Sequence, residues 1–168
     1  MARRLLLHVT LAALVLAAGG CAAGDRASTG AAPGQATVER VVDGDTLVVR
    51  IQGRRERVRF LGMDTPESVK PNTPVQCFAI EASKRTKALL PPGAHVRLVR
   101  DVEQRDRYQR LLAYVYRARD NLFVNVSLVR DGYAVPYTYP PNVAHTTEIV
   151  AAGAEARDAK RGLWSACH

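Results

Sequence analysis

The feature that most constrains the fold is a pair of strand-like runs joined by an Asp-Gly dipeptide. Residues 37–42 and 46–52 are both rich in Val and Leu, and Asp43 and Gly44 lie between them. Asp-Gly between two such runs is a strong short-range signal for a β-hairpin. The chain is therefore predicted to begin its folded part as two antiparallel strands.

A third strand is expected over residues 55–62. Val58 and Phe60 alternate there with Arg57 and Arg59. This period of two places the apolar side chains on one face and the arginines on the other. The first third of the folded part is thus predicted to be a three-stranded meander with one basic face.

A helix is predicted next. Thr73 is a suitable N-cap, Pro74 fits the first helical position, and Gln76 completes a capping box. Residues 91–93 (Pro-Pro-Gly) should stop this helix. The later elements are expected to be strands over 95–100 and 111–116, a short helix capped by Asn121, and a last helix over 146–160.

The resulting order is β-β-β-α-β-β-α-α. Five short strands with a helix after the third suit a small closed barrel. We therefore predict a mainly β fold with α (α+β), a five-stranded OB-type barrel with three helices.

Composition limits the class of protein. The chain has 168 residues, of which 47% are hydrophobic and 24% charged, which excludes wholesale disorder, collagen and coiled coil. The formal net charge is +8, which favours an anionic partner such as nucleic acid or an anionic membrane surface. A generically basic surface would give the same total charge.

The N-terminus is typical of an export signal. Arg3 and Arg4 precede an apolar run over residues 5–18, which is too short for a membrane span. Cys21 follows small residues and resembles a bacterial lipoprotein processing site; cleavage after Ala23, releasing a soluble protein, is the alternative. We expect a signal peptide over 1–20, a lipidated Cys21 with a flexible linker over 21–35, and a domain over 36–168. The protein would then be a lipid-anchored membrane protein, or a secreted one if Cys21 is not lipidated.

Two further cysteines remain, Cys77 and Cys167. Outside the cytoplasm such residues persist as disulfides, so we predict that they pair. Two separate buried thiols are the alternative. The chain contains no CxxC motif or Cys/His cluster of the kind that binds zinc.

Five side chains together suit phosphodiester hydrolysis. Asp45 and Asp64 can supply hard oxygen ligands to Ca²⁺ or Mg²⁺. Glu67 can act as a general base on water. Arg59 and Arg110 can bind a phosphodiester and stabilise the charge that develops on it. Each residue is ordinary alone, in an Asp-Gly turn, an acidic loop or a solvated basic run.

The motifs at residues 42–46 (VDGDT), 58–67 (VRFLGMDTPE) and 106–110 (DRYQR) resemble those of the staphylococcal nuclease (thermonuclease) family. The resemblance extends over residues 36–164 and includes the segments at 137–139 and 162–164. It implies an OB-fold barrel with three helices. It also implies a Ca²⁺-dependent endonuclease that acts on DNA and RNA, cleaves the P–O5′ bond and leaves 3′-phosphate ends.

The resemblance also implies roles for individual residues. Asp45 and Asp64 match the calcium carboxylates, and Thr65 matches a residue that gives its backbone carbonyl to the ion. Glu67 matches the acid beside the attacking water, and Asp43 an acid near the metal. The two phosphate-binding arginines correspond to Arg59 and Arg110. Aromatic residues around the nucleotide correspond to Tyr108, Tyr137 and Tyr139, for which barrel packing is the alternative.

One departure stands next to the proposed catalytic residues. Gln109 occupies a position where the family normally has glycine; if that glycine has a positive φ, Gln109 would strain the loop and could reorient Arg110. The expected enzyme is a monomer that prefers single strands. The alternatives are a non-catalytic nucleic-acid-binding OB-fold module at the cell surface, and an adhesion or scaffold protein that uses the barrel only structurally.

Overall fold

The computed structural model describes residues 34–69 and 72–167. The predicted signal peptide and the lipidated Cys21 lie outside the described residues, as does nearly all of the predicted linker. Within the described ranges, no helix combines the length and the apolar character that crossing a membrane requires.

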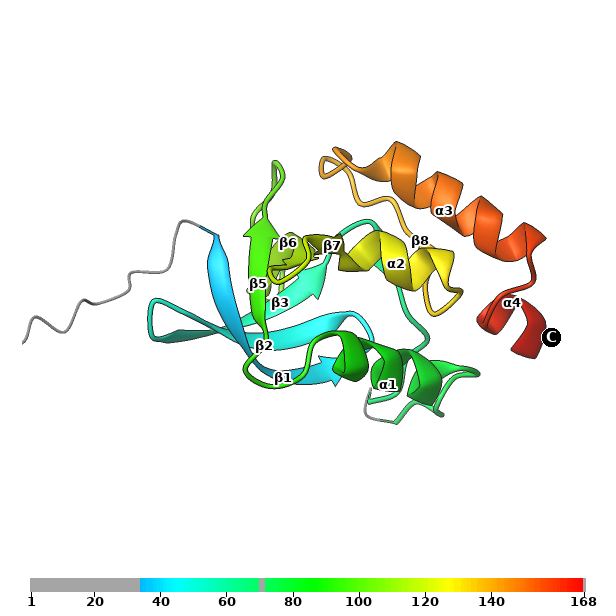
Figure 1. The fold of residues 1–168 in the computed structure, drawn as a ribbon, viewed down its shortest axis with the longest axis horizontal. Helices are drawn as coiled ribbons and strands as arrows, with labels where there is room; N and C mark the ends of the chain where they lie inside the picture. Colours follow the sequence, from blue (N-terminus) through cyan, green and yellow to red (C-terminus); the bar gives the residue numbers. More distant parts are fainter. Residues whose placement is uncertain (1–33, 70–71, 168) are drawn as a thin grey trace, which may run out of the picture.

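Five strands form a closed barrel (Figure 1). The strands are β1 (Gln35–Asp43), β2 (Thr46–Ile51), β3 (Arg54–Phe60), β5 (His95–Val99) and β6 (Leu111–Arg117). Neighbours pair antiparallel in the order β3-β2-β1-β5-β6, and a parallel pairing of β3 with β6 closes the ring. The predicted OB-type barrel and the α+β class are confirmed.

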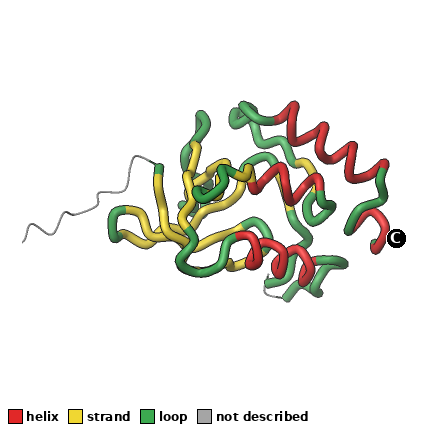
Figure 2. The backbone as a smooth tube through the Cα atoms, in the orientation of Figure 1, coloured by secondary structure: helices red, strands yellow, loops and turns green. Residues whose placement is uncertain are grey.

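Over residues 34–69 and 72–167, four helices and three two-residue strands accompany the barrel. Figure 2 shows how these helices lie around the strands. The strands are β4 (Met63–Asp64), β7 (Leu122–Phe123) and β8 (Val135–Pro136). The helices are α1 (Ala79–Leu89), α2 (Val124–Arg130), α3 (Thr146–Asp158) and the short α4 (Leu163–Ala166). β4 pairs with β8, which brings the segment after α2 against the segment that leaves β3.

The alternation in the sequence predicts the core correctly. Leu47, Val49, Val58 and Phe60 are buried inside the barrel, while Arg57 and Arg59 point to the other face of β3. Burying one such apolar side chain contributes about 1.5–3 kcal/mol, so the pattern fixes which face of each strand is inside.

The predicted start of the first helix is wrong. α1 begins at Ala79, and Phe78 precedes it in a left-handed conformation with φ of 67°. The predicted capping box does not form, because the Gln76 side chain accepts a hydrogen bond from the backbone N–H of Glu67 instead. A tertiary contact has therefore replaced a local one.

Asn121 does not cap α2 either. It has φ of 53°, and the two residues after it form β7 against the end of β6. α2 begins at Val124, two residues later than expected. The buried Asn125 side chain then donates to the carbonyl of Leu61 at 2.8 Å and accepts from the N–H of Val115 at 2.9 Å, which ties α2 to the turn after β3.

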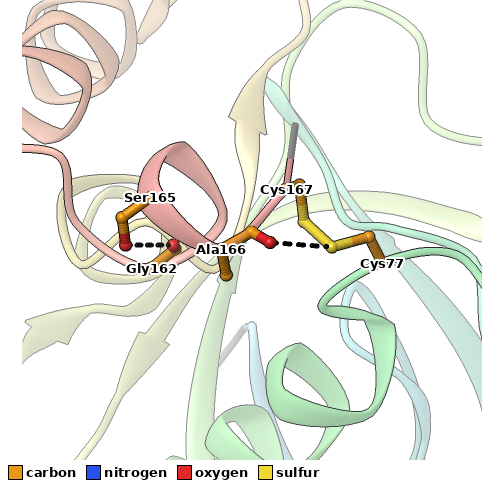
Figure 3. The surroundings of a disulfide bond; sticks show 5 residues. All are labelled: Cys77, Gly162, Ser165, Ala166 and Cys167. Atoms are coloured by element: carbon orange, nitrogen blue, oxygen red, sulfur yellow. Dashed lines mark hydrogen bonds between the residues drawn. A yellow bond between two sulfur atoms is a disulfide. The ribbon is translucent and has the colours of Figure 1, made fainter.

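The predicted disulfide between Cys77 and Cys167 is present (Figure 3). It joins the chain just before α1 to the residue that follows α4, with a Cα–Cα distance of 5.9 Å. α4 is held to the body by a hydrogen bond from the N–H of Leu163 to the carbonyl of Gly132 at 2.9 Å. The end of the chain is thereby fixed beside the start of α1.

Candidate active site

The β1–β2 turn lies against β4 and α1. A Cβ atom on Gly44 would come within 2.8 Å of the Thr65 side chain, so only glycine permits this approach. The hydroxyl of Thr86 in α1 donates to the carbonyl of Gly44 at 2.6 Å. The turn therefore presents Asp43 and Asp45 to the loop after β4 in a fixed arrangement.

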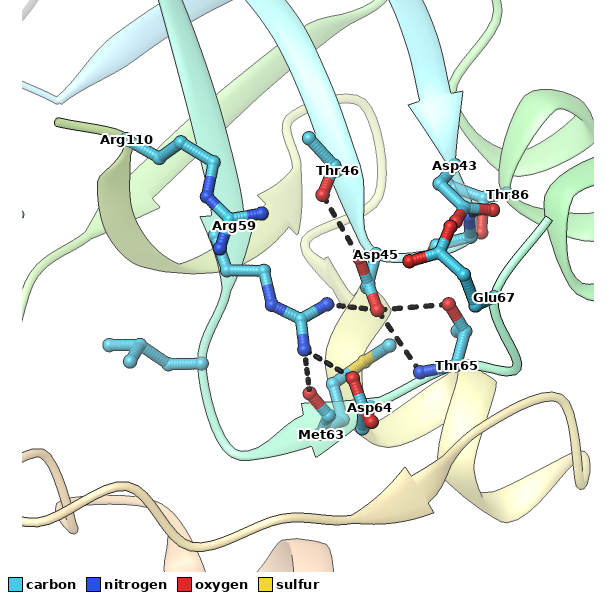
Figure 4. Close-up of polar contacts among 12 residues, drawn as sticks. Asp43, Asp45, Thr46, Arg59, Met63, Asp64, Thr65, Glu67, Thr86 and Arg110 are labelled. Carbon is cyan, nitrogen blue, oxygen red and sulfur yellow. Dashed lines mark hydrogen bonds and ion pairs between the residues drawn. The ribbon is translucent and has the colours of Figure 1, made fainter. Parts of the chain in front are cut away.

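Asp45 is buried and fully engaged (Figure 4). Its Oδ2 accepts hydrogen bonds from the N–H of Thr65 at 3.1 Å and from the Thr65 hydroxyl at 2.9 Å. Its Oδ1 accepts from the hydroxyl of Thr46 at 3.0 Å, and Oδ2 also forms an ion pair with Arg59. These contacts hold the carboxylate in one orientation.

Arg59 links the two predicted calcium carboxylates. Its guanidinium forms ion pairs with Asp45 and Asp64 and donates to the carbonyl of Met63 at 3.5 Å (Figure 4). The Arg59 side chain is 17% exposed, whereas that of Asp64 is 50% exposed. One cation thus offsets the repulsion between two carboxylates that share a space, and Asp64 keeps an exposed side.

Glu67 lines the same pocket as Asp43 and Asp45 of the β1–β2 turn. Its backbone N–H donates to Oε1 of Gln76 at 2.7 Å, and its own Oε1 accepts from the N–H of Val69 at 3.0 Å. The next residue, Ser68, donates its hydroxyl to Oδ1 of the buried Asp43 at 2.6 Å. Asp43 therefore holds the segment that carries Glu67.

Arg110 is positioned by Asp106. Oδ2 of Asp106 accepts from Nε of Arg110 at 2.6 Å, and its Oδ1 accepts from the N–H groups of Tyr108 and Arg110 at 2.9 and 3.0 Å. Gln109 has φ of 62°, the left-handed conformation expected for a glycine position. The Arg110 side chain nevertheless faces the site.

A second ion pair supports this loop. Arg105 forms two hydrogen bonds to the carboxylate of Glu56 in β3, at 2.9 and 3.0 Å, and donates to the carbonyl of Gln109 at 2.7 Å. The hydrogen bonds from Arg105 hold the pKa of Glu56 below its usual value. Gln109, the residue with the left-handed backbone, is therefore held to the barrel through its carbonyl oxygen, because Arg105 bridges that oxygen and Glu56.

Two adjoining pockets contain the predicted site residues. The first, of about 490 Å³, is lined by the acidic residues Asp43, Asp45, Asp64 and Glu67, together with Thr65, Arg59 and Arg110. The second, of about 460 Å³, is lined by Tyr108, Tyr137 and Tyr139. Both pockets share Arg59, Asp64 and Arg110. Tyr139 also packs partly against the core, so barrel packing, the alternative to contact with a nucleotide, applies to it in part.

Known proteins were compared with the chain. The family model described as "Staphylococcal nuclease homologue" matches residues 57–166. The chain is 46% identical over 127 residues to the thermonuclease of Staphylococcus intermedius, covering 76% of this chain and 74% of the relative.

The chain belongs to the staphylococcal nuclease family.

Other members of the family are also similar. The thermonuclease of Staphylococcus hyicus is 42% identical over 128 residues, covering 76% of this chain and 74% of the relative. The endonuclease YncB of Bacillus subtilis (strain 168) is 40% identical over 130 residues, covering 77% of this chain and 61% of the relative.

The metal ligands predicted for this staphylococcal nuclease family member are few. Among residues 34–69 and 72–167, no three His, Cys, Asp or Glu side chains form a group that could hold a metal. The predicted set has two carboxylates, Asp45 and Asp64, and the backbone carbonyl of Thr65. All three are hard oxygen donors, which suit Ca²⁺, and water or phosphate oxygens would complete its coordination.

Several functional contacts of this family member are absent from the sequence-based prediction. Ser68 ties the segment of Glu67 to Asp43, and Asp106 holds Arg110. Asp106 begins the motif at residues 106–110 and Ser68 directly follows Glu67, and these positions are the signals that could have suggested them. Gln76 was assigned to a helix cap. Arg57 lines the first pocket beside Arg59 and could have been inferred from the strand alternation.

Proposed function

We propose that the protein is a Ca²⁺-dependent endonuclease that hydrolyses phosphodiester bonds of DNA and RNA and leaves 3′-phosphate ends. The observation that carries the proposal is the first pocket, which is lined by Glu67, Asp45, Asp64, Arg59 and Arg110 together. The names thermonuclease and endonuclease of its relatives support the same reaction class.

The two arginines bind the phosphate in this proposal. Arg59 approaches from β3 and Arg110 from the loop just before β6, and each is oriented by a carboxylate before any substrate binds. Donors held in this way stabilise the charge that develops on the phosphoryl oxygens without reorganising during the reaction. Since Arg59 also contacts Asp45 and Asp64, it connects the phosphate to the metal ligands.

Glu67 accepts the proton of the attacking water. Its carboxylate lines the same pocket as both arginines. Asp45, Asp64 and the Thr65 carbonyl would hold Ca²⁺, which supplies positive charge to the phosphate and the nucleophile. Tyr108, Tyr137 and Tyr139 provide aromatic surface for a base, which favours single strands because their bases are unpaired.

The protein acts outside the cytoplasm in this proposal. The signal-like residues 1–20 would direct export, Cys21 would carry the lipid anchor, and the domain would act as a monomer. The Cys77–Cys167 disulfide supports this location, since disulfides persist in oxidising compartments. Metabolic labelling with a radioactive fatty acid tests it: label should enter the parent and be absent from the Cys21→Ser variant.

Cleavage of plasmid DNA and of single-stranded RNA tests the activity. We expect cleavage in Ca²⁺, none in excess calcium chelator, and 3′-phosphate ends on the products. Full activity in chelator would refute the metal mechanism, and full activity in Mg²⁺ alone would refute only the choice of metal. Tight binding without cleavage in any metal would instead support the non-catalytic binding module.

A further inference from the structure

We infer that Gln76 is a positioning residue for Glu67, and that the Cys77–Cys167 disulfide fixes Gln76 in that role. The inference rests on the proposed function, because it concerns the group that activates water there. It adds a residue and a covalent bond that neither the family motifs nor the proposed mechanism requires.

Gln76 binds the backbone of Glu67 from both sides. Its side-chain Oε1 accepts from the N–H of Glu67 at 2.7 Å, and its own N–H donates to the carbonyl of Glu67 at 3.0 Å. Two hydrogen bonds between the same two residues fix both their separation and their orientation. The Glu67 carboxylate can move only through its side-chain torsions while these bonds last.

The disulfide is adjacent to this contact in the sequence. Cys77 follows Gln76 directly, and its partner Cys167 follows α4, which is hydrogen-bonded to Gly132. Before α1 begins at Ala79, the covalent bond is thus the nearest anchor of Gln76 to the C-terminal part of the molecule. Breaking the bond would free the segment that orients Glu67.

The disulfide also lies beside the metal ligands. A depression of about 280 Å³ is lined by Gln76, both cysteines, Asp64 and Thr65. Arg59 is held by the buried Asp45 as well as by Asp64, and Arg110 is held by Asp106, so neither arginine relies on the disulfide alone. The two hydrogen bonds between Gln76 and Glu67 are called the clamp below. Loss of the clamp should impair turnover and leave phosphate binding intact.

Two substitutions of Gln76 test the clamp. Gln76→Met keeps the length of the side chain and removes the acceptor, whereas Gln76→Glu keeps an acceptor oxygen. We expect kcat of Gln76→Met to fall by about tenfold to a hundredfold with KM unchanged, as displacement of a catalytic group does. Gln76→Glu should recover much of the rate, because it keeps an acceptor oxygen for the N–H of Glu67.

The disulfide is tested by the Cys77→Ser/Cys167→Ser double variant, assayed well below its Tm. As in Gln76→Met, its kcat should fall while its KM stays unchanged. Adding Gln76→Met to the double variant should lower kcat little further. Amide hydrogen exchange at Glu67 gives a readout without activity: the N–H should be protected in the parent and exchange faster in both variants. Parental kcat and parental exchange in Gln76→Met would overturn the inference, whereas a parent with protected Glu67 but no cleavage would overturn only the proposed function.

A separate observation concerns Arg57. It lies two residues before Arg59 on the same face of β3, about 6.6 Å along the strand, and lines the first pocket. Arg59 and Arg110 are paired with aspartates, but among the described residues none forms an ion pair or hydrogen bond with the guanidinium of Arg57. We propose that Arg57 binds a phosphate of the polynucleotide next to the one that is cleaved.

Binding of oligonucleotides tests this subsite without cleavage, in the Glu67→Gln background. Arg57→Ala should weaken binding of a single-stranded octanucleotide, reduce the slope of log K against log salt by about 0.7, and leave binding of a mononucleotide unchanged. Arg54→Ala is the matched control, because it removes the same charge from the same strand outside the pocket. Equal effects of both substitutions would overturn the subsite.

Discussion

At the residue scale, Gln109 shows how a departure from a family pattern is accommodated. Its left-handed backbone costs about 1–2 kcal/mol for a residue with a side chain. Arg105 binds its carbonyl and Asp106 binds its two neighbours, so the loop is held in spite of this cost. The strain is therefore local and does not turn Arg110 away from the pocket.

Two substitutions separate strain from catalysis at this loop. Gln109→Gly should raise Tm slightly and leave the cleavage rate near that of the parent. Arg110→Ala should lower kcat by about 10²–10³-fold, because it removes a donor to the transition state. Thermal unfolding and steady-state kinetics measure both effects. A large gain in rate for Gln109→Gly would mean that Arg110 is misplaced in the parent.

At the element scale, the disulfide is the main device that joins distant parts of the chain. It closes a loop with a sequence separation of 90 residues, for which chain entropy gives about 4–5 kcal/mol as an upper value. Reduction, or the Cys77→Ser/Cys167→Ser substitutions, should lower the free energy of unfolding by up to that amount. Urea denaturation with and without reductant measures it, and coincident midpoints would contradict it.

The elements also show which parts of the fold could be predicted. β1 and β2 are predictable from the apolar runs on either side of Asp43 and Gly44. β3 is predictable because one of its faces is buried, which leaves a period of two, and β6 is a continuous apolar run because its first five residues are all buried. The start of α1 was missed because Gln76 bonds to Glu67, nine residues earlier, rather than to its own helix. β4 and β8 have two residues each, too short for any periodicity.

The candidate site, like the fold, could be predicted from the sequence only in part. Asp45, Glu67 and Arg59 belong to motifs with recognisable spacing, and the structure brings them to one pocket. Asp106 and Ser68 act through hydrogen bonds across the fold, so their importance depends on contacts that spacing alone does not reveal.

At the scale of the whole molecule, Asp101 and Tyr114 form a hydrogen-bonded pair that contributes to the pH dependence of stability. Burial and a hydrogen bond to Asp101 raise the pKa of Tyr114 to about 12. Burial alone would raise the pKa of Asp101, but hydrogen bonds from Ala144, Tyr114 and Val102 leave it lowered. The pair joins β6 to the loop after β5 and to the segment before α3.

The sign of each shift predicts the pH dependence. A lowered carboxyl pKa stabilises the fold above about pH 4 and loses this contribution as the pH falls. A raised tyrosine pKa stabilises the fold below about pH 10 and loses this contribution as the pH rises towards the folded value. Tm should therefore fall at both the acidic and the alkaline end of the pH range. Tyr114→Phe should remove part of the decrease in Tm at alkaline pH. An unchanged alkaline profile in Tyr114→Phe would contradict this assignment.

The central claim is that the pocket between the β1–β2 turn, β3 and β4 hydrolyses phosphodiester bonds. The most direct test is the single-turnover cleavage rate of Glu67→Gln, measured beside its affinity for the same oligonucleotide. We expect the rate to fall by about 10²–10⁴-fold while affinity stays near that of the parent, because the substitution removes a base and keeps the shape of the side chain. A variant that cleaves as fast as the parent would place the chemistry elsewhere and contradict the claim.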